Sequence, residues 1–145
     1  TDGASSWQRV TTGERFTFGM AIDPSTPSRI VAGSSGNTLL ISNDEGKSWQ
    51  ERHLPVTAHP QMAVFSVAFH PLRPGIVMAG THRHDGRAIE GLFMSIDSAK
   101  TFRQVPMDIP RVNMSVITPT AGEPAAAYIG FIGTGIFRVE LGKKR

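Results

Sequence analysis

The chain has 145 residues, the size of one ordinary domain and enough to bury a hydrophobic core. Its apolar content of 39% excludes wholesale disorder, and a net charge of only +3 gives no reason to expect a nucleic-acid partner. The chain has no cysteine, which excludes disulfides and thiol chemistry, and no apolar run of about 18 residues that would predict a transmembrane segment.

Short β-rich runs follow one another along the chain, and most of them end at a glycine, a proline or an aspartate-containing turn. No segment combines a 3.6-residue apolar period with helix caps, so we expect an all-β fold with very little helix. The runs expected to form strands are 16–22, 30–33, 38–42, 48–51, 64–69, 76–79, 91–96, 101–105, 112–118, 126–132 and 135–139.

Four successive runs form one repeat group. An eight-residue motif recurs between the third and fourth runs of the first two groups. Ser42–Trp49 and Ser95–Phe102 share Ser, any residue, Asp, any residue, a small residue, Lys, Ser or Thr, and an aromatic. The segment from Asp2 to Trp7 has the same frame without its start, and Glu140 takes the Asp place in a weaker fourth copy. Successive copies are 42, 53 and 43 residues apart. These intervals are near the period of about 40–50 residues that four-stranded propeller blades show.

We interpret this motif as structural rather than catalytic. A carboxylate can accept backbone N–H groups two residues on and close a tight turn, and the Ser or Thr hydroxyl adds a local hydrogen bond. Gly46 suits a positive φ, which Ala99 in the matching place suits less well, and the aromatic residue can pack between neighbouring sheets. The residues assigned to the motif are Asp2, Trp7, Ser42, Asp44, Gly46, Ser48, Trp49, Ser95, Asp97, Thr101 and Phe102.

A second motif repeats in register with the first. Asp23–Pro27 and His70–Pro74 both have prolines at their second and fifth positions. In both copies an Ala-Gly pair, at 32–33 and 79–80, ends six residues after the second proline. His70 takes the place of Asp23 and is therefore expected to be a turn residue. Two motifs in one register indicate a true structural repeat.

Together the motifs resemble the Asp-box, or BNR-repeat, β-propeller families over nearly the whole chain. The Asp-Pro-x-x-Pro turn followed by Ile-Val-Ala-Gly is more similar to the branch of sortilin, the xyloglucanases and the photosystem II assembly factors than to sialidases. The resemblance implies a β-propeller of four-stranded antiparallel sheets, with the Asp box away from the ligand face. It also implies an extracytoplasmic setting, whether secreted, periplasmic or lumenal. The motif is specific for a fold rather than for an activity.

The residues give little support to catalysis. Sialidases, which also have Asp boxes, contain an Arg-Ile-Pro motif and a catalytic Tyr–Glu pair. In this chain Arg29–Val31 lacks the proline, and the only tyrosine, Tyr128, is expected in the core. Glycosidases need two carboxylates about 5–10 Å apart. Nothing in the sequence pairs any two of the aspartates and glutamates that lie outside the turn motifs. We therefore assign no catalytic residue, metal or cofactor, and predict a non-catalytic binding or scaffold module for a protein partner. The alternative is a glycoside hydrolase or a glycan-binding propeller fragment.

The candidate binding site is a longer loop in the second group, Thr81–Glu90. The Ala-Gly pair and the aspartate are 17 residues apart there, against 11 in the first group. Inserted loops on a rigid scaffold often bind ligands, and the positive charge of this loop suits an anionic partner. The alternatives are a solvated hairpin tip or a metal site formed by His82, His84 and Asp85. The residues assigned to this binding face, with two from neighbouring loops, are His82, Arg83, His84, Asp85, Arg87, Glu90, His59 and Arg111.

The chain supplies about three blades, whereas propeller rings have about four to eight. We expect one propeller segment over 1–145, with repeat units at about 8–49, 50–102 and 103–145 and an outer-strand remnant at 1–7. Further blades of a longer chain would complete the ring, and we favour this solution. The alternatives are a different protein, or a homodimer that closes a six-bladed ring, in which Trp7–Val10 of each copy completes the other's last blade.

Overall fold

The computed structural model describes residues 5–10, 15–56, 62–83, 85, 91–107, 114–122 and 125–141. Within these ranges the fold consists of antiparallel strands joined by turns, and no helix is present. The strands are β1 (Thr17–Ile22), β2 (Ile30–Ser34), β3 (Thr38–Ser42), β4 (Gln50–His53), β5 (Met62–Phe69), β6 (Val77–Arg83), β7 (Leu92–Ser95), β8 (Arg103–Gln104), β9 (Met114–Pro119), β10 (Ala126–Phe131) and β11 (Gly135–Glu140).

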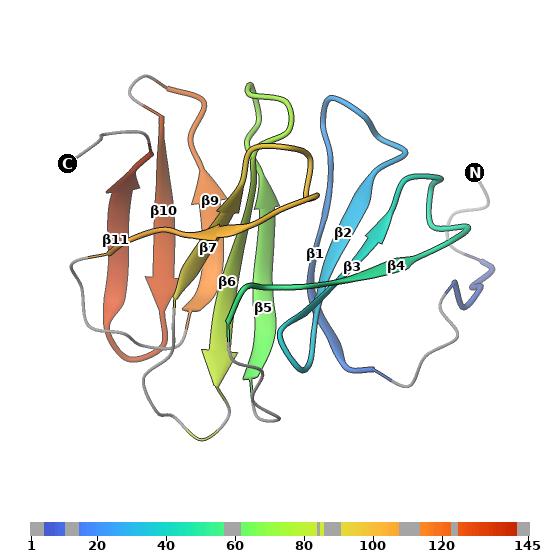
Figure 1. The fold of residues 1–145 in the computed structure, drawn as a ribbon, viewed down its shortest axis with the longest axis horizontal. Helices are drawn as coiled ribbons and strands as arrows, with labels where there is room; N and C mark the ends of the chain where they lie inside the picture. The colour runs from blue at the N-terminus through green and yellow to red at the C-terminus, as the bar shows by residue number, and fades with distance from the viewer. Residues whose placement is uncertain are drawn as a thin grey trace.

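The strands form three sheets in chain order, and within each sheet every strand pairs with the next one along the chain. The first sheet has the order β1-β2-β3-β4, the second β5-β6-β7-β8 and the third β9-β10-β11. Figure 1 shows the sheets side by side, with the second sheet between the other two. The sheets are not closed into a ring. The predicted fold class, all-β with antiparallel sheets arranged as propeller blades, is confirmed.

Each expected strand overlaps one observed strand, and the largest difference lies in β6. The second strand of that sheet was expected to end at Ala79, but it continues to Arg83 and pairs along its whole length with β5. The extension places His82 opposite Ala63 and Arg83 opposite Met62. Three residues of the predicted loop, Thr81, His82 and Arg83, are therefore strand residues with fixed positions.

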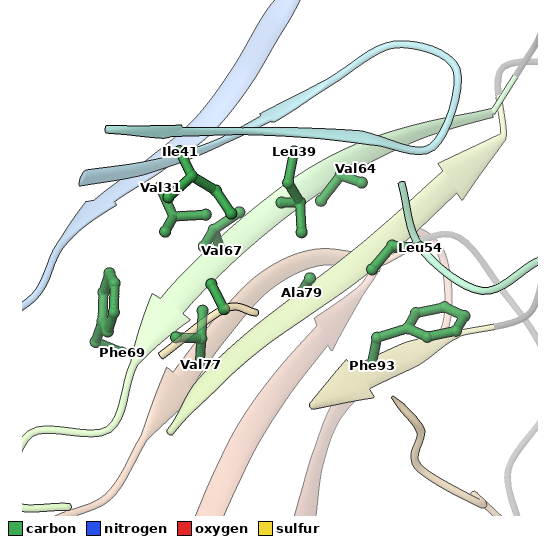
Figure 2. Close-up of a cluster of buried hydrophobic side chains, with 11 residues drawn as sticks. Val31, Leu39, Ile41, Leu54, Val64, Val67, Phe69, Val77, Ala79 and Phe93 are labelled. Atoms are coloured by element: carbon green, nitrogen blue, oxygen red, sulfur yellow. The ribbon is translucent and has the colours of Figure 1, made fainter. Parts of the chain in front are cut away.

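Two hydrophobic cores lie between the sheets. The core between the first and second sheets contains Val31, Leu39 and Ile41, whose side chains point toward β5 and β6 in Figure 2. The core between the second and third sheets joins residues such as Met78 and Ile129. Burying one such side chain contributes about 1.5–3 kcal/mol, so the packing of sheet on sheet is a main source of stability.

The repeated Ala-Gly pairs allow the sheets to approach each other closely. A Cβ atom at Gly33 would lie 2.2 Å from the carbonyl oxygen of Val64, in the next sheet. A Cβ atom at Gly80 would lie 3.0 Å from the Cδ1 atom of Ile117, again in the next sheet. Glycine is required at position 33 because backbone atoms of β5 occupy the space of a side chain, whereas the atoms nearest to position 80 belong to side chains of β9. The second sequence motif thus marks the contact between blades.

Two expectations about single residues are wrong. Tyr128 is 46% exposed rather than part of the core, because alternate residues of a strand point to opposite faces and its face of the third sheet is the outer one. Glu140 does not take the place of an Asp in a turn. It is the last residue of β11, lies opposite Ala126 and accepts a hydrogen bond from Arg138.

Candidate functional site

The first aspartate turn, Ser42–Trp49, is held together by its own side chains. The Asp44 carboxylate accepts hydrogen bonds from the Ser42 hydroxyl at 2.7 Å, from the Ser48 hydroxyl at 2.6 Å and from the Ser48 amide at 2.9 Å. The Gly46 amide donates to the Ser42 hydroxyl at 2.8 Å. The expectation that the carboxylate takes the amide two residues on is therefore wrong in detail. The Asp44 carboxylate takes the amide four residues on, and the serine takes the nearer one.

The second aspartate turn, Ser95–Phe102, has the same set of hydrogen bonds. Asp97 accepts from Ser95 at 2.7 Å and from the hydroxyl and amide of Thr101 at 2.6 and 2.9 Å. The Ala99 amide donates to the Ser95 hydroxyl at 3.0 Å. Ala99 has a φ of 67°, so it adopts the left-handed conformation that Gly46 adopts at the matching place. The sequence repeat therefore corresponds to a repeat of geometry.

These hydrogen bonds explain the acidity of both aspartates. The hydroxyl and amide of Ser48, followed by the hydroxyl of Ser42, lower the pKa of Asp44 from 3.8 to about 2. The same groups of Thr101 and Ser95 lower the pKa of Asp97 to about 2. A carboxylate that is ionised at neutral pH and already accepts several hydrogen bonds is a poor general acid. The geometry supports a structural role for both residues.

The aromatic residues of the motif differ in their surroundings. The Trp49 indole nitrogen donates to the Gly46 carbonyl at 3.0 Å, and Phe102 packs against the core between the first and second sheets. Trp7, in the N-terminal copy of the motif, is 91% exposed. Asp2 lies outside the described residues.

The Asp-Pro and His-Pro turns have equivalent bonding in spite of the different residues. The Asp23 carboxylate accepts from the Ser25 amide at 2.9 Å, and the His70 Nδ1 atom accepts from the Leu72 and Arg73 amides at 3.2 and 3.1 Å. Burial raises the pKa of Asp23, but hydrogen bonds from Ser25 and Arg29 outweigh it and lower the pKa overall. His70 is therefore a turn residue, as expected, and Nδ1 is its acceptor atom.

The predicted binding loop is described only in part. Arg83 donates to Asp85 at 2.8 Å, and the two side chains are 17% and 21% exposed. His82 is half-buried, with its ring centroid 4.8 Å from that of Phe65. The structure thus brings three of the predicted residues together at the end of β6. The predicted residues that lie outside the described ranges are His59, His84, Arg87, Glu90 and Arg111.

Two aromatic residues that sequence reasoning missed extend this cluster across two sheets. The ring centroids of Phe18 on β1 and Phe65 on β5 lie 4.7 Å apart, with an interplanar angle of 28°. Both rings are half-buried, and together with His82 they form what we call the aromatic row. Phe18 lies where the pairing of β1 with β2 shifts register, and Phe65 lies where the pairing of β5 with β6 does so. The third sheet has a similar shift between β9 and β10. Their equal spacing from the Ala-Gly pairs is the signal that could have found them.

The cluster offers an apolar surface edged by charge rather than a set of reacting groups. The aromatic rings supply stacking area, and Arg83 is held in place by Asp85. Within the described part of the chain, no group of three or more His, Asp or Glu residues is placed to hold a metal ion. Since His84 lies outside that part, the metal alternative for this loop is not tested.

The packed antiparallel sheets, with one turn geometry repeated between third and fourth strands, define the chain as a β-propeller segment. The Sortilin-Vps10 family model, described as "Sortilin, neurotensin receptor 3", matches residues 1–125, and the chain belongs to this family. The resemblance to a BNR-type propeller family is confirmed at that level. No curated protein matches the chain. Nowhere in the described residues is there a helix long and apolar enough to cross a membrane.

Proposed function

We propose that this chain is a non-catalytic, protein-binding part of a sorting-receptor-type propeller, and that it binds a polypeptide partner at the aromatic row and Arg83. The observation that carries the proposal is the stack of Phe18 on Phe65, which joins two blades and continues to His82. The family supports a protein ligand. The same family membership supports a lumenal or extracellular setting.

The chemistry of the cluster fits a polypeptide with apolar and acidic side chains. Aromatic residues and arginine are the residue types that contribute most to protein interfaces, because they bury large areas and bond with fixed geometry. The Phe18 and Phe65 rings are partly exposed and can still bury area against a partner. The ion pair with Asp85 fixes Arg83 before binding, which reduces the entropy lost when a partner docks.

A random peptide library displayed on phage, selected against the full chain, tests the proposal. Titration calorimetry with the best peptide should show at least a tenfold loss of affinity in Phe65→Ala and in Arg83→Ala, equal to about 1.4 kcal/mol. Arg103→Ala is the control, because Arg103 is exposed on the outer strand β8. Melting temperatures of all variants must be compared to exclude unfolding.

The aromatic rings also favour one second candidate, a glycan ligand, since sugar rings stack on aromatic faces. A glycan array with the same variants separates the two. Glycan binding that depends on Phe65, with no peptide selected, would replace the proposal. Peptide binding that is equal in Phe65→Ala and the unmodified chain would contradict the assigned site.

A further inference from the structure

The base of the predicted binding loop, Thr81–Glu90, is closed by a threonine side chain. Both the amide and the hydroxyl of Thr81 donate to the Gly91 carbonyl, each at 3.1 Å. Thr81 is fully buried, and the strand pairing of β6 with β7 ends one residue earlier, at Gly80 and Leu92. The hydroxyl therefore reinforces the last contact between the two segments before they separate into the loop.

The first sheet has no equivalent of this contact. Ser34 takes the place of Thr81, because Gly33 pairs with Leu39 as Gly80 pairs with Leu92. The Ser34 hydroxyl donates in another direction, to the carbonyl of Phe16 at 2.8 Å, just before β1. There β2 and β3 are joined by a short turn over residues 35–37. The bond from the Thr81 hydroxyl thus accompanies the longer loop.

The acceptor, Gly91, is packed against two methionine side chains. A Cβ atom at this position would lie 2.7 Å from the Cε atom of Met107 and 3.6 Å from that of Met114. The two methyl groups therefore occupy the space beside Gly91. Met114 is fully buried in the core between the second and third sheets, and Met107 packs against the same core. The carbonyl that Thr81 binds is thus fixed by the core.

The position of Arg83 depends on the same region. Arg83 lies two residues beyond Thr81 and on the same face of β6, because successive strand residues point to opposite faces. Arg83 pairs with Met62, whose carbonyl accepts a hydrogen bond from the Gly36 amide of the first sheet at 2.8 Å. The end of β6 is therefore held by β5 and by Gly91. Among these contacts, the hydroxyl bond of Thr81 is made by a side chain, so a substitution can remove it.

We propose that Thr81 is a positioning residue of the binding site, whose hydroxyl holds the base of the loop and thereby the place of Arg83 relative to the aromatic row. Thr81 is buried and does not itself reach a partner. The inference rests on the proposed function and deepens it, because it names the contact that fixes Arg83 before a partner docks. A site that is fixed in advance loses less entropy on binding.

Limited digestion with trypsin, which cleaves after arginine, tests the inference without a partner. The Arg83 side chain is 17% exposed and bonded to Asp85, so trypsin can take it up only when the base of the loop opens. Thr81→Val should speed the release of fragment 1–83 at least about threefold, because losing one hydrogen bond raises the open population by about that factor. Thr81→Ser, which keeps the hydroxyl, should be cleaved at the rate of the unmodified chain. Cleavage after Arg103 is the internal reference, since global unfolding would speed both cleavages.

The matched control is Thr120→Val. Thr120 also donates its amide and its hydroxyl to one carbonyl, that of Ala126, at 2.8 and 3.2 Å. It follows β9, and Figure 1 shows that β6 and β9 end at opposite ends of the molecule, so cleavage after Arg83 should not change. Equal rates of this cleavage in Thr81→Val and Thr120→Val would overturn the inference and would leave the proposed function in place.

Titration calorimetry with the selected peptide gives the second measurement. Thr81→Val should weaken binding at least about threefold, Thr81→Ser should not, and the loss should disappear in chains that also carry Arg83→Ala. An equal loss with and without Arg83 would show that Thr81 acts on the fold as a whole, and would overturn the inference. Unchanged affinity in Arg83→Ala alone would instead contradict the proposed function, while the digestion would still decide whether Thr81 holds the loop.

Discussion

Gly33 and Val64 belong to different sheets, yet a Cβ atom at position 33 would lie 2.2 Å from the Val64 carbonyl oxygen and 2.9 Å from its carbonyl carbon. The atoms in the way are backbone atoms of β5, which cannot rotate aside as a side chain can. The effect of a substitution at position 33 on stability therefore reports how closely the first and second sheets pack.

Gly33→Ala should be strongly destabilising. The added methyl group forces β2 and β5 apart and disturbs the core between the sheets, and overpacking of this kind costs about 1–3 kcal/mol, near the upper end where backbone must move. For a chain of this size we expect the melting temperature to fall by at least about 6 °C. Gly122→Ala is the control, because no atom lies within 4 Å of its added Cβ. Equal melting temperatures for the two variants would contradict the close contact.

The hydrogen bond between Ser66 and Ile117 gives a second test of sheet-to-sheet contact. The buried Ile117 amide, on β9, donates to the Ser66 hydroxyl on β5 at 3.0 Å. Ser66→Ala removes the acceptor and leaves that amide without this bond, which should cost about 1–3 kcal/mol in the free energy of unfolding. Denaturation in urea measures the loss.

The matched control is Ser115→Ala. The Ser115 hydroxyl also bonds a backbone group, the Gly130 carbonyl at 3.1 Å, but it is exposed and the bond lies within the third sheet. Water can replace this bond, so the change should stay within about 0.5 kcal/mol. A larger loss in Ser115→Ala than in Ser66→Ala would contradict the role of Ser66 between sheets.

The aspartate turns predict an acid-dependent contribution to stability. Hydrogen bonding lowers the pKa of Asp44 and Asp97 from 3.8 to about 2 in the folded chain. Because the folded value is the lower one, their contribution is fully present above about pH 4 and is lost as the pH falls toward 2. The double variant Asp44→Asn with Asp97→Asn lacks this contribution at every pH.

Thermal melts of both proteins between pH 7 and pH 2 measure this contribution. The unmodified chain should melt at a clearly higher temperature than the double variant at pH 6, and the difference should shrink below pH 4. Glu45→Gln is the control for charge, because it neutralises another carboxylate of the first turn while leaving Asp44 in place. A difference in melting temperature that stays constant down to pH 2 would contradict the role of ionisation.

Much of the fold could be predicted because its signals are local. The aspartate turns bond within eight residues, so the repeat of Ser42–Trp49 in the sequence predicts a repeat of geometry. The features that could not be predicted depend on contacts between residues far apart in the sequence. Phe18 meets Phe65 only because two sheets pack face to face, and Tyr128 is exposed only because no described sheet covers its face. Neither fact is encoded in a local pattern. The binding cluster, which depends on such contacts, could be found only in part.

The left-handed residue of each aspartate turn leads to the last prediction, which concerns Gly46. Its φ is 86°, and an added Cβ would lie 3.6 Å from the nearest Trp49 ring atom, an ordinary contact distance. Ala99 shows that the turn accepts a side chain in this place at a φ of 67°. Gly46→Ala therefore introduces backbone strain of about 1–2 kcal/mol, part of which is offset by the smaller conformational freedom of alanine in the unfolded chain.

We expect a net loss of about 1 kcal/mol for Gly46→Ala, clearly less than for Gly33→Ala, when both are measured by urea denaturation in the same buffer. The contrast has a physical reason: position 46 is limited by φ alone, whereas position 33 is limited by the backbone of another sheet. If Gly46→Ala proved the more damaging change, the turn and not the contact between sheets would be the stricter constraint on these glycines. Such a large cost at position 46 would also conflict with the second turn, which has an alanine, Ala99, in the same left-handed place.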